Sequence, residues 1–472
     1  MKLAIFWFRR DLRLADNPGL LAALDAAEQV LPIYLWSPED EGEWAPGAAA
    51  RWWLHHSLGA LDEALRARGT RLLLRAGPAA DTLAKLVAES GAEAVYWNRL
   101  YDPALVTRDR AIKRQLGDAG IEAHSCQGSV LYEPWELATG KGDPYRVFTP
   151  FWKAALKRAE PDPPVAAPRD LRAPSKWPAG LALDALGLMP TINWYDGLAA
   201  TWRVGEDGAQ QRLQAWCDDG LGAYAEGRNR PDRDGTSALS PYLHHGELSP
   251  RQAWHAAAAR RGELPESEIE CWLRELGWRE FAHHVLFHFP RTPTEPMYEK
   301  YAAFPWREDH AELLDAWQRG CTGIPIVDAG MRQLWHTGWM HNRVRMIVAS
   351  LLVKNIRAPW QTGARWFWDT LVDADLASNT LGWQWSAGSG ADAAPYFRIF
   401  NPVTQGEKFD PAGAYVKRWV PELAALPPKR VHRPWETPPA GYPAPILDLA
   451  RSRAAALDAL QSMRARNERG AP

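Results

Sequence analysis

The stretch LAIFWFRRDLRLADNPGL, residues 3–20, sets the fold of the first part of the chain. Its first six residues are apolar and rich in aromatic and branched side chains, which predicts a buried strand. Pro18 follows Asn17 and suits the first turn of a helix, so we expect a helix over residues 17–28. A buried strand followed at once by a helix is the first half of a β–α–β unit.

The same alternation continues outward from this stretch. Four more apolar runs are typical of strands, and segments of helical composition lie between them. Because β–α–β connections make neighbouring strands parallel, we predict an α/β domain with a doubly wound, Rossmann-like parallel sheet over residues 1–130. No standard glycine-rich phosphate loop is present, so a bound nucleotide would lie elsewhere. The further strands are expected at 30–36, 71–76, 94–97 and 121–126, and the further helices at 48–68, 78–90 and 103–119.

The remainder of the chain has no strand-like runs. Proline is frequent between residues 131 and 202, as in PDPPVAAP at 161–168, which predicts a long inter-domain linker. From residue 203 to 472 we expect an all-α domain, because Gly and Pro separate segments of helical character. These segments cover 210–217, 250–261, 268–289, 310–319, 326–337, 343–355, 362–371 and 448–466.

Composition excludes several classes of protein. Of 472 residues, 46% are hydrophobic and 24% charged, which is ordinary for a folded globular chain. The longest apolar run, residues 346–353, is too short to span a bilayer, and the start MKLAIFWFRR has too short an apolar stretch for a secretory signal. We therefore expect a cytoplasmic monomer without a membrane segment. The four scattered cysteines predict free thiols and no metal site.

Charge and tryptophan content bear on possible partners. The net charge of −2 gives no global attraction to nucleic acid, so contact with DNA requires a local patch. The chain has 26 tryptophans, more than its 13 tyrosines and 12 phenylalanines together, and eleven of them lie between Trp272 and Trp385. Indoles can stack on bases or carry an electron hole, although a single tryptophan is more often part of a core.

Two segments of the helical part combine charge with aromatic side chains. Residues 321–360 carry five cations against the single acid Asp328, and GWMHNRVRM at 338–346 mixes them with groups that suit phosphates and unstacked bases. A solvated helix face explains this pattern equally well. In DADLASNTLGWQW at 373–385, two carboxylates and an amide need partners when buried, and Arg345 is a candidate. A helix end capped by Asp and Asn is the alternative.

Two further segments have both a functional and a structural interpretation. In RDGTSALSPYLHHGELSP, residues 233–250, hydroxyls and backbone N–H groups at a helix start suit a phosphate, but ordinary capping also explains them. In ECWLRELGWREF, residues 270–281, Glu275 and Trp278 share a helix face with Trp272 a turn earlier. That carboxyl is either a surface acid or an acid desolvated for chemistry.

Eight strings of the sequence lie in the order found in one family, and over nearly the whole chain the sequence resembles the photolyase and cryptochrome flavoproteins. The resemblance implies an α/β domain that can hold a light-harvesting antenna and a helical domain that binds FAD. It also implies light-driven repair of ultraviolet-damaged DNA. The strings are FWFRRDLRLADNPGL, RVFTPFWK, TSALSPYL, ELGWREF, TGIPIVDAGMRQL, GWMHNRVRM, LVDADLASNTLGWQW and DAAPYFRIFNPVTQGEKFD.

The resemblance assigns FAD contacts position by position. Asn379 would face the redox-active central-ring nitrogen of the flavin, where plant cryptochromes typically have Asp, and this favours repair. Arg345, paired with Asp373, would stabilise a reduced anionic flavin. Ala238 stands where relatives often have arginine, which leaves one phosphate contact to the backbone. The phosphates and adenine would lie against Tyr224, Thr236, Ser237, Ala238, Leu239, Ser240 and Trp272, and the ribityl chain and isoalloxazine against Asp373, Ala374 and Asp375.

The resemblance also implies a substrate. A cyclobutane pyrimidine dimer, flipped out of the duplex, would stack on tryptophans while Glu275 hydrogen-bonds one of its carbonyls. The histidines that (6-4) photolyases carry around Asn342 and Met346 are missing, so the cyclobutane dimer is the better assignment. The pocket would comprise Glu275, Trp278, Asn342, Met346 and Trp385, and the DNA backbone would contact Arg228, Arg343 and Gln405.

Electron supply and light harvesting complete the expectation. Trp306, Trp360 and Trp383 match a chain of three tryptophans from the surface to the flavin. Ala104 and Leu105 replace polar residues of some folate-binding relatives, so methenyltetrahydrofolate in another pose, a deazaflavin, or no antenna all remain open.

The leading hypothesis is thus a cyclobutane pyrimidine dimer photolyase. The alternatives are a blue-light photoreceptor cryptochrome, disfavoured by the short stretch that follows FDPAGAYVKRW, and a DASH-type cryptochrome, disfavoured because Trp278 and Trp385 are retained. A generic flavin oxidoreductase is disfavoured because no nicotinamide fingerprint is present.

Overall fold

The N-terminal part of the protein is a five-stranded parallel sheet, as predicted. The computed structural model describes residues 1–396 and 398–469. The strands lie in the order β3-β2-β1-β4-β5, so the direction of strand addition reverses between β1 and β4. Such a reversal leaves a crevice at the carboxyl ends of the strands. The strands are β1 (Leu3–Phe8), β2 (Gln29–Trp36), β3 (Leu73–Ala76), β4 (Ala94–Asn98) and β5 (Glu122–Cys126).

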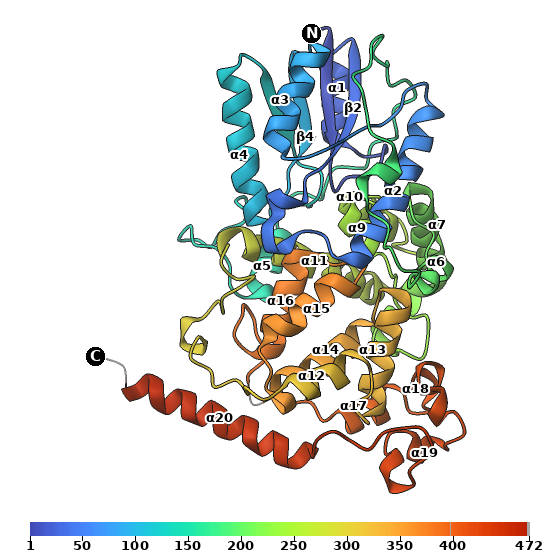
Figure 1. Cartoon of the computed structure of the whole chain (residues 1–472), viewed down its shortest axis with the longest axis vertical. Coiled ribbons are helices and arrows are strands. Elements are labelled where there is room, and N and C mark those ends of the chain that lie inside the picture. The colour runs from blue at the N-terminus through green and yellow to red at the C-terminus, as the bar shows by residue number, and fades with distance from the viewer. Residues whose placement is uncertain (397, 470–472) are drawn as a thin grey trace.

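Helices cover both faces of this sheet (Figure 1). Along β1, Phe6 packs on one face with residues of α1 (Pro18–Ala26) and α2 (Ala48–Arg66). Its neighbour Trp7 packs on the other face with residues of α3 (Ala79–Ser90) and α4 (Pro103–Asp118). Because successive strand residues point to opposite faces, a strand covered on both sides must be apolar throughout, as β1 is.

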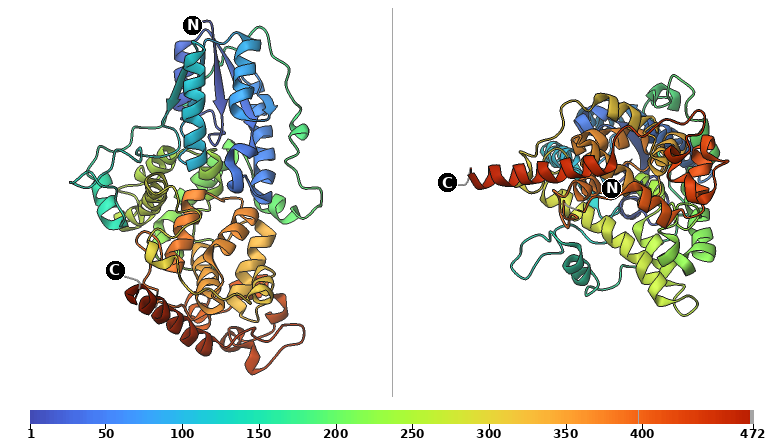
Figure 2. Two further views of the ribbon diagram at one scale, coloured as in Figure 1. Left: turned by 60° about the vertical axis from the view of Figure 1, so that its left-hand side comes forward. Right: turned by 90° about the horizontal axis from the view of Figure 1, so that it is seen from below.

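The segment between residues 131 and 202 is folded onto the rest of the molecule. It contains α5 (Phe148–Ala155) and α6 (Asp196–Thr201). Between these helices the chain runs down the side of the α/β part to the helical part (Figure 2). Backbone contacts hold it there; for example, the Val30 N–H donates to the Arg172 carbonyl at 3.1 Å. The segment therefore has fixed contacts along much of its length.

The remaining chain is helical, as expected, and it packs below the carboxyl ends of the strands (Figure 1). Its two main cores lie around α13 to α16 and around α10 and α11. The helices are α7 (Glu206–Ala215), α8 (Tyr224–Gly227), α9 (Ser240–His245), α10 (Pro250–Ala258), α11 (Glu266–His288), α12 (Ala311–Gln318), α13 (Pro325–Thr337), α14 (Asn342–Ser350), α15 (Trp360–Thr370), α16 (Leu376–Ala387), α17 (Pro402–Phe409), α18 (Ala414–Trp419), α19 (Pro428–Val431) and α20 (Leu449–Arg469).

Buried polar contacts join the two parts. The Arg13 guanidinium donates to the Gly246 carbonyl at 2.9 Å, and the Leu12 N–H donates to the His245 carbonyl at 3.2 Å. The Glu247 carboxylate accepts the Trp53 indole N–H at 3.1 Å and the Gly205 N–H at 3.0 Å. These contacts fix the carboxyl edge of the sheet against α9.

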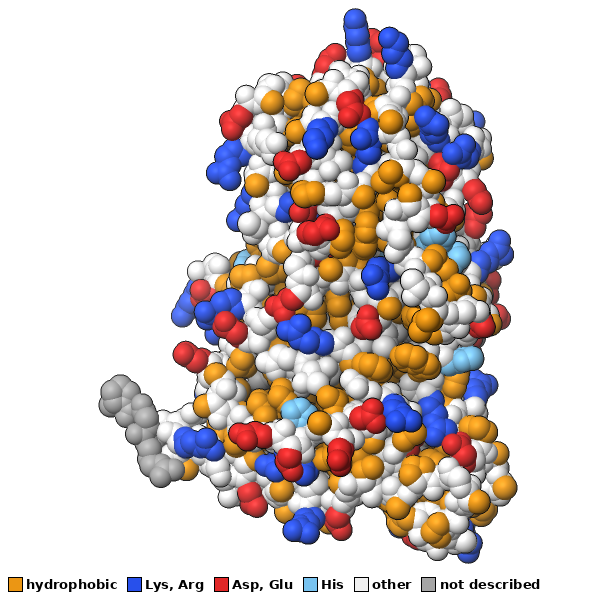
Figure 3. Space-filling model, in the orientation of Figure 1, with side chains coloured by type: hydrophobic (Ala, Val, Ile, Leu, Met, Phe, Trp, Pro, Cys, Tyr) orange, Lys and Arg blue, Asp and Glu red, His pale blue; other side chains and the backbone are white. Residues whose placement is uncertain are grey.

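The surface has no dominant charge on the face drawn in Figure 3, where acidic and basic side chains are interspersed. This agrees with the net charge of −2. In the described residues, no helix is long and apolar enough to cross a membrane.

Candidate functional site

A three-residue polar hub lies where α9, α14 and the segment before α16 meet. Asp373 Oδ2 accepts the Ser240 hydroxyl at 2.6 Å and an Arg345 guanidinium N–H at 2.7 Å. The Asp373 side chain is only 3% exposed, so this charge needs the partners it has. The pairing of Arg345 with Asp373 inferred from sequence is present. Trp339 adds an indole N–H to the Ser240 hydroxyl at 3.3 Å.

One oxygen of this hub is left without a partner. Asp373 Oδ1 is buried and accepts no hydrogen bond from the described part of the chain. A buried acceptor without a donor is costly, and its presence in a folded protein points to a missing ligand or water. The hub therefore offers an acceptor to a hydroxyl or amide N–H of a bound molecule.

The turn that precedes α9 presents backbone rather than long side chains. Ala238 adopts a left-handed conformation with φ of 50°, which is strained for a residue with a Cβ. Arg212 braces this turn, donating to the Ser237 carbonyl at 2.7 Å and the Thr236 carbonyl at 3.0 Å. Leu239, the next residue, is buried and anchors the turn. The carbonyls of Thr236 and Ser237 are thus held by Arg212, a residue that sequence reasoning did not identify.

Asp375 has a structural role as well as a place in the site. Its Oδ1 accepts the Ser378 N–H at 2.8 Å and caps α16, so the capping interpretation of this segment is correct for Asp375. Oδ2 lies 3.6 Å from His283 and 3.9 Å from His244. Burial raises its pKa, but His283, His244 and Arg279 outweigh burial and hold the pKa well below the usual range. Asp375 therefore stays ionised.

Asn379 lies on the first turn of α16 and faces α15. Its amide nitrogen donates to the Ala364 carbonyl at 3.0 Å. This bond orients the carboxamide, because the nitrogen is committed to α15 and the oxygen is left for another donor. Ala374, between the two aspartates, is buried.

A second cluster joins α8 and α11. Arg228 Nη1 lies 2.6 Å from a Glu275 carboxylate oxygen and 3.5 Å from the Cys271 sulfur. The guanidinium also lies over the Tyr224 ring, 5.5 Å from its centroid. Burial raises the pKa of Glu275, and Arg228 offsets part of the increase. The Glu275 side chain is 28% exposed, so it is a partly buried acid paired with Arg228. Trp272, one turn earlier on α11, is buried.

A third cluster surrounds the start of α14. Arg343 donates to the Asn229 side-chain oxygen at 2.5 Å and lies 4.5 Å from the Phe409 ring centroid. It also reaches the Met346 sulfur at 3.7 Å. Asn342 is exposed beside it. Phe409 belongs to α17, which also carries the partly exposed Gln405, so this helix and α14 form one surface.

The interpretation of residues 321–360 as a basic surface patch is wrong for several of its cations. Lys354 is 1% exposed and donates to the Ala387 carbonyl at 3.0 Å, and burial lowers its pKa well below the usual range. Arg332 pairs with Glu422 at 2.9 Å and Arg345 with Asp373. The number of cations can be read from the sequence, but the sequence does not show which of them are neutralised inside the fold. In this segment Arg343 remains at the surface.

Two partly exposed tryptophans lie on neighbouring helices, Trp278 on α11 and Trp385 on α16. Phe148 stacks on Trp278 with ring centroids 3.8 Å apart and planes 9° apart. Phe148 lies in the string RVFTPFWK, to which no role could be given from sequence. Trp278 therefore has one covered face.

The three tryptophans proposed as a chain all lie near α15. Trp360 begins this helix, and one turn later Gly363 packs against Trp383, so closely that a Cβ on Gly363 would lie 2.1 Å from the indole. Trp306 and Trp360 line one small cavity. Trp306 and Trp360 thus share one cavity, and Trp383 packs on the helix that Trp360 begins.

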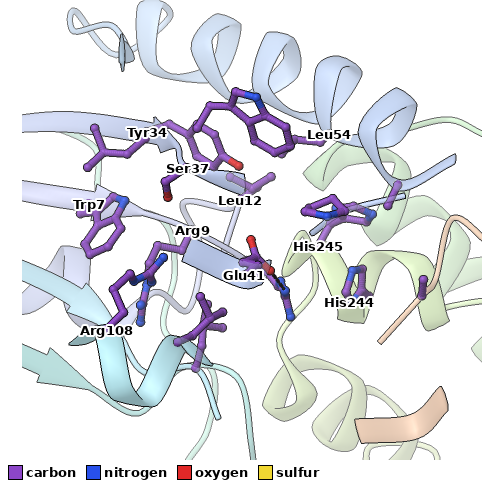
Figure 4. Close-up of a pocket in the computed structure, with 18 of the residues that line it drawn as sticks. Trp7, Arg9, Leu12, Tyr34, Ser37, Glu41, Leu54, Arg108, His244 and His245 are labelled. Carbon is purple, nitrogen blue, oxygen red and sulfur yellow. Dashed lines mark hydrogen bonds and ion pairs between the residues drawn. The ribbon is translucent and has the colours of Figure 1, made fainter. Parts of the chain in front are cut away.

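A pocket of about 60 Å³ lies at the carboxyl edge of the sheet, where α9 meets it (Figure 4). Arg9 and Arg108 both lie over the Trp7 ring, at 5.0 and 4.8 Å from its centroid. Arg10 also lines the pocket and forms ion pairs of 2.6 Å with Glu41 and with Asp102. Leu105 lines this pocket, as does Ala374, so the pocket adjoins the segment of Asp373 and Asp375.

Metal ligands do not cluster in the described residues: no group of three or more His, Cys, Asp or Glu side chains is placed to hold an ion. The four cysteines are free, as expected.

Comparison with known proteins gives consistent results along the chain. Residues 4–169 match the model of the DNA photolyase family, and residues 272–462 match the FAD binding domain of DNA photolyase. The chain is 47% identical to a deoxyribodipyrimidine photo-lyase of Agrobacterium fabrum, with 98% of each chain covered.

Solved structures agree with these matches. A bacterial class III photolyase from Agrobacterium tumefaciens superposes with a TM-score of 0.95 at 46% identity, covering 98% of both chains. An archaeal photolyase from Sulfolobus tokodaii, described with two FAD molecules, superposes with a TM-score of 0.85 at 30% identity over 98% of this chain and 100% of that one. With both family models matched and full-length relatives this similar, the chain belongs to the photolyase and cryptochrome family.

Proposed function

We propose that the protein repairs cyclobutane pyrimidine dimers in ultraviolet-damaged DNA by light-driven electron transfer. The observation that carries this proposal is that two clusters lie on helices packed against α16, since both α11 and α14 contact it. The Ser240–Asp373–Arg345 hub is a site for a polar cofactor, and Glu275 with Arg228 and Trp278 offers a partly buried acid beside a partly exposed indole. The 47% identity to a deoxyribodipyrimidine photo-lyase supports the same reaction.

The residues of the hub fit FAD. Asp373 Oδ1 is the free acceptor that a ribityl hydroxyl or a ring N–H requires, and the braced turn at Thr236, Ser237, Ala238 and Ser240 suits a pyrophosphate. Tyr224, Leu239 and Trp272 would border the adenine side. When bound and reduced, FAD supplies the photoexcited electron. Arg345 would place its positive charge next to the ring system, and Asn379 would place its amide there. Ala374 and the ionised Asp375 would lie behind these two residues.

We assign the lesion pocket to Glu275, Trp278, Asn342, Met346 and Trp385. Trp278 and Trp385 offer ring faces to the two pyrimidines. Glu275 would form a hydrogen bond with a dimer carbonyl that gains negative charge; burial raises the pKa of this carboxyl, and Arg228 offsets part of the increase. One electron enters the dimer, the two bonds of the cyclobutane ring that join the pyrimidines break, and the electron returns. Arg228, Arg343 and Gln405 would contact the DNA backbone.

Trp306, Trp360 and Trp383 would carry an electron inward when the flavin has become oxidised. The close packing of Trp383 on α15 and the cavity shared by Trp306 and Trp360 support a path through these residues. For an antenna, the pocket of Figure 4 is the candidate site, and Arg10, one of its lining residues, forms ion pairs with Glu41 and Asp102. A deazaflavin and a methenyltetrahydrofolate are the candidates.

Three further assignments rest on the sequence. We divide the chain into an antenna domain at 1–130, a linker at 131–202 and a helical FAD- and DNA-binding domain at 203–472. We also expect the protein to act as a monomer and in the cytoplasm.

The test is repair of a thymine-dimer oligonucleotide by the purified, reduced, FAD-loaded protein in blue light. Repair of duplex DNA in light but not in darkness is the expected result. Repair of single strands alone would favour a DASH-type cryptochrome, and no repair despite bound, photoreducible FAD would favour a photoreceptor. A duplex with a (6-4) photoproduct serves as the matched lesion and should remain unrepaired.

A further inference from the structure

Residues 145–152, from Tyr145 to Trp152, form a short segment that we call the bracket. The bracket comprises the residues just before α5 and the first five residues of that helix. It lies in the part of the chain that connects the α/β and helical parts. It lies against α11, and it also contacts the loop that follows α16. These two helices carry Trp278 and Trp385.

The contact with α11 is a ring stack. Phe148 and Trp278 lie face to face, 3.8 Å between centroids and 9° between planes, and Phe148 is 5% exposed. The Trp152 ring is also nearly parallel to Phe148, at 6.2 Å and 12°. The indole of Trp278 therefore rests on Phe148, and its other face is the one available to a ligand.

Two contacts fix the bracket on α11. Gly277 abuts the Trp152 ring so closely that a Cβ there would lie 2.5 Å from a ring carbon. The Tyr145 N–H donates to His284 Nε2 at 3.0 Å, while His284 Nδ1 lies 3.0 Å from the Pro134 carbonyl. That arrangement requires a neutral ring with its proton on Nδ1, and burial lowers the pKa of His284 to about 4.

A second pair of contacts ties the bracket to the loop after α16. The Asp392 N–H donates to the Arg146 carbonyl at 3.1 Å. The Phe148 backbone N–H acts on the Asp392 carboxylate and offsets part of the rise in its pKa that burial causes. The bracket thus connects α11, which carries Trp278, to the loop that follows α16.

We propose that Phe148 is a positioning residue of the lesion pocket, which holds the Trp278 indole in the orientation that receives one pyrimidine of the dimer. This inference rests on the proposed function, since it takes Trp278 as a stacking residue. Its physical basis is preorganisation: an indole already fixed by a stack loses little rotational freedom when a base stacks on its other face. A loose indole would have to be ordered by the lesion.

The test compares Phe148→Leu with Phe148→Tyr in the FAD-loaded protein. The measured quantity is the ratio of dissociation constants for an undamaged duplex and the same duplex carrying one thymine dimer. Leucine keeps the apolar volume but removes the stack, so the ratio should fall about three- to tenfold, the worth of one aromatic pair. Tyrosine keeps the stack and should restore the ratio. Binding of undamaged duplex should not change.

Phe151→Leu is the matched control. Phe151 is a buried ring of the same helix that packs on Phe281 and His284, with centroids 5.2 Å away. The Phe151→Leu substitution should lower the thermal midpoint of unfolding without changing the ratio of dissociation constants. An equal fall in the ratio for Phe151→Leu, or an unchanged ratio for Phe148→Leu, would overturn the inference.

Trp278→Leu separates this inference from the proposed function. A fall in the ratio with Trp278→Leu but not with Phe148→Leu rejects the positioning role alone. No fall with Trp278→Leu rejects the lesion pocket and the positioning role together. If both single variants reduce the ratio, Phe148→Leu should have no further effect in the Trp278→Leu background.

Discussion

Asp373 is the residue on which the cofactor site depends. One of its oxygens holds Ser240 and Arg345, and the other is free for a ligand. The residue thus combines a positioning role with a binding role, and both need the negative charge.

Asp373→Asn should reduce retention of FAD. The amide keeps the shape but weakens the bond to Arg345, which costs about 1–3 kcal/mol for a hydrogen bond to a charged group. The flavin-to-protein absorbance ratio after dialysis measures this loss. Asp315→Asn, which removes an exposed carboxylate 3.5 Å from Arg319, is the control and should retain FAD fully. Equal retention in the two variants would contradict the assignment.

Glu275→Gln should lower the repair rate more than it lowers DNA binding. An amide N–H can still reach a carbonyl but cannot share a proton with it as charge develops, and we expect a loss of about tenfold in rate, or 1.4 kcal/mol. Single-turnover repair with saturating dimer substrate measures this step. Glu270→Gln, an exposed acid on the same helix, should leave the rate unchanged. An unaltered rate for Glu275→Gln would remove its assigned role.

At the scale of elements, the packing of α15 against α16 determines where Trp360 and Trp383 lie. Their packing depends on Gly363, because any side chain there meets Trp383. The Asn379 bond to the Ala364 carbonyl is made across the same interface. A change in helix separation would therefore move the amide and the indole together.

Gly363→Ala should lower the thermal midpoint and loosen FAD. Its Cβ would lie 2.1 Å from a ring carbon of Trp383, and overpacking of a core costs about 1–3 kcal/mol. Gly382→Ala is the control, since a Cβ on that α16 residue meets nothing within 4 Å. The control should be neutral or slightly stabilising, because alanine favours a helix over glycine. Similar midpoints for the two variants would contradict the packing argument.

Trp360→Phe should abolish photoreduction of oxidised FAD while chemically reduced enzyme still repairs dimers. Phenylalanine fills most of the space but is much harder to oxidise than an indole. Flavin absorbance under continuous blue light with an external thiol measures photoreduction. Trp366→Phe, on the same helix but stacked on the surface residue Trp335, should photoreduce normally. Normal photoreduction by Trp360→Phe would place the path elsewhere.

The elements were largely predictable from sequence, and their side-chain partners were not. Strand and helix positions follow from local apolar patterns, as β1 with its six apolar residues illustrates. The burial of Lys354 and the stack of Phe148 on Trp278 join residues far apart in sequence, and periodicity carries no information about such contacts. Arg212 bonds to backbone carbonyls, for which sequence has no signal.

At the scale of the whole molecule, Glu247 joins the α/β part to the helical part. It accepts hydrogen bonds from Trp53 of α2 and from Gly205 ahead of α7. Burial raises its pKa to about 8, although these donors act in the opposite direction. The proton on this carboxyl therefore matters for stability near neutral pH.

Glu247→Gln should change how stability depends on pH. A raised folded-state pKa contributes stability that is fully present below the usual value of 4.5 and is lost as pH rises to about 8. Between pH 4.5 and pH 8, the free energy of unfolding of the wild type should fall by about 1.4 kcal/mol per pH unit relative to the variant, because glutamine cannot ionise. Denaturant unfolding at pH 5 to 8 measures the difference. Glu63→Gln, an exposed acid of α2, should follow the wild type, and parallel curves for Glu247→Gln would contradict the argument.

The central claim is that the electron given to the dimer returns. The most direct measurement counts dimers repaired by reduced enzyme under oxygen-free illumination without added reductant, while the flavin spectrum is recorded. Repair of many dimers per enzyme with an unchanged flavin spectrum is the expected result. Oxidation of one flavin for each dimer repaired, with repair ending after one turnover, would contradict it.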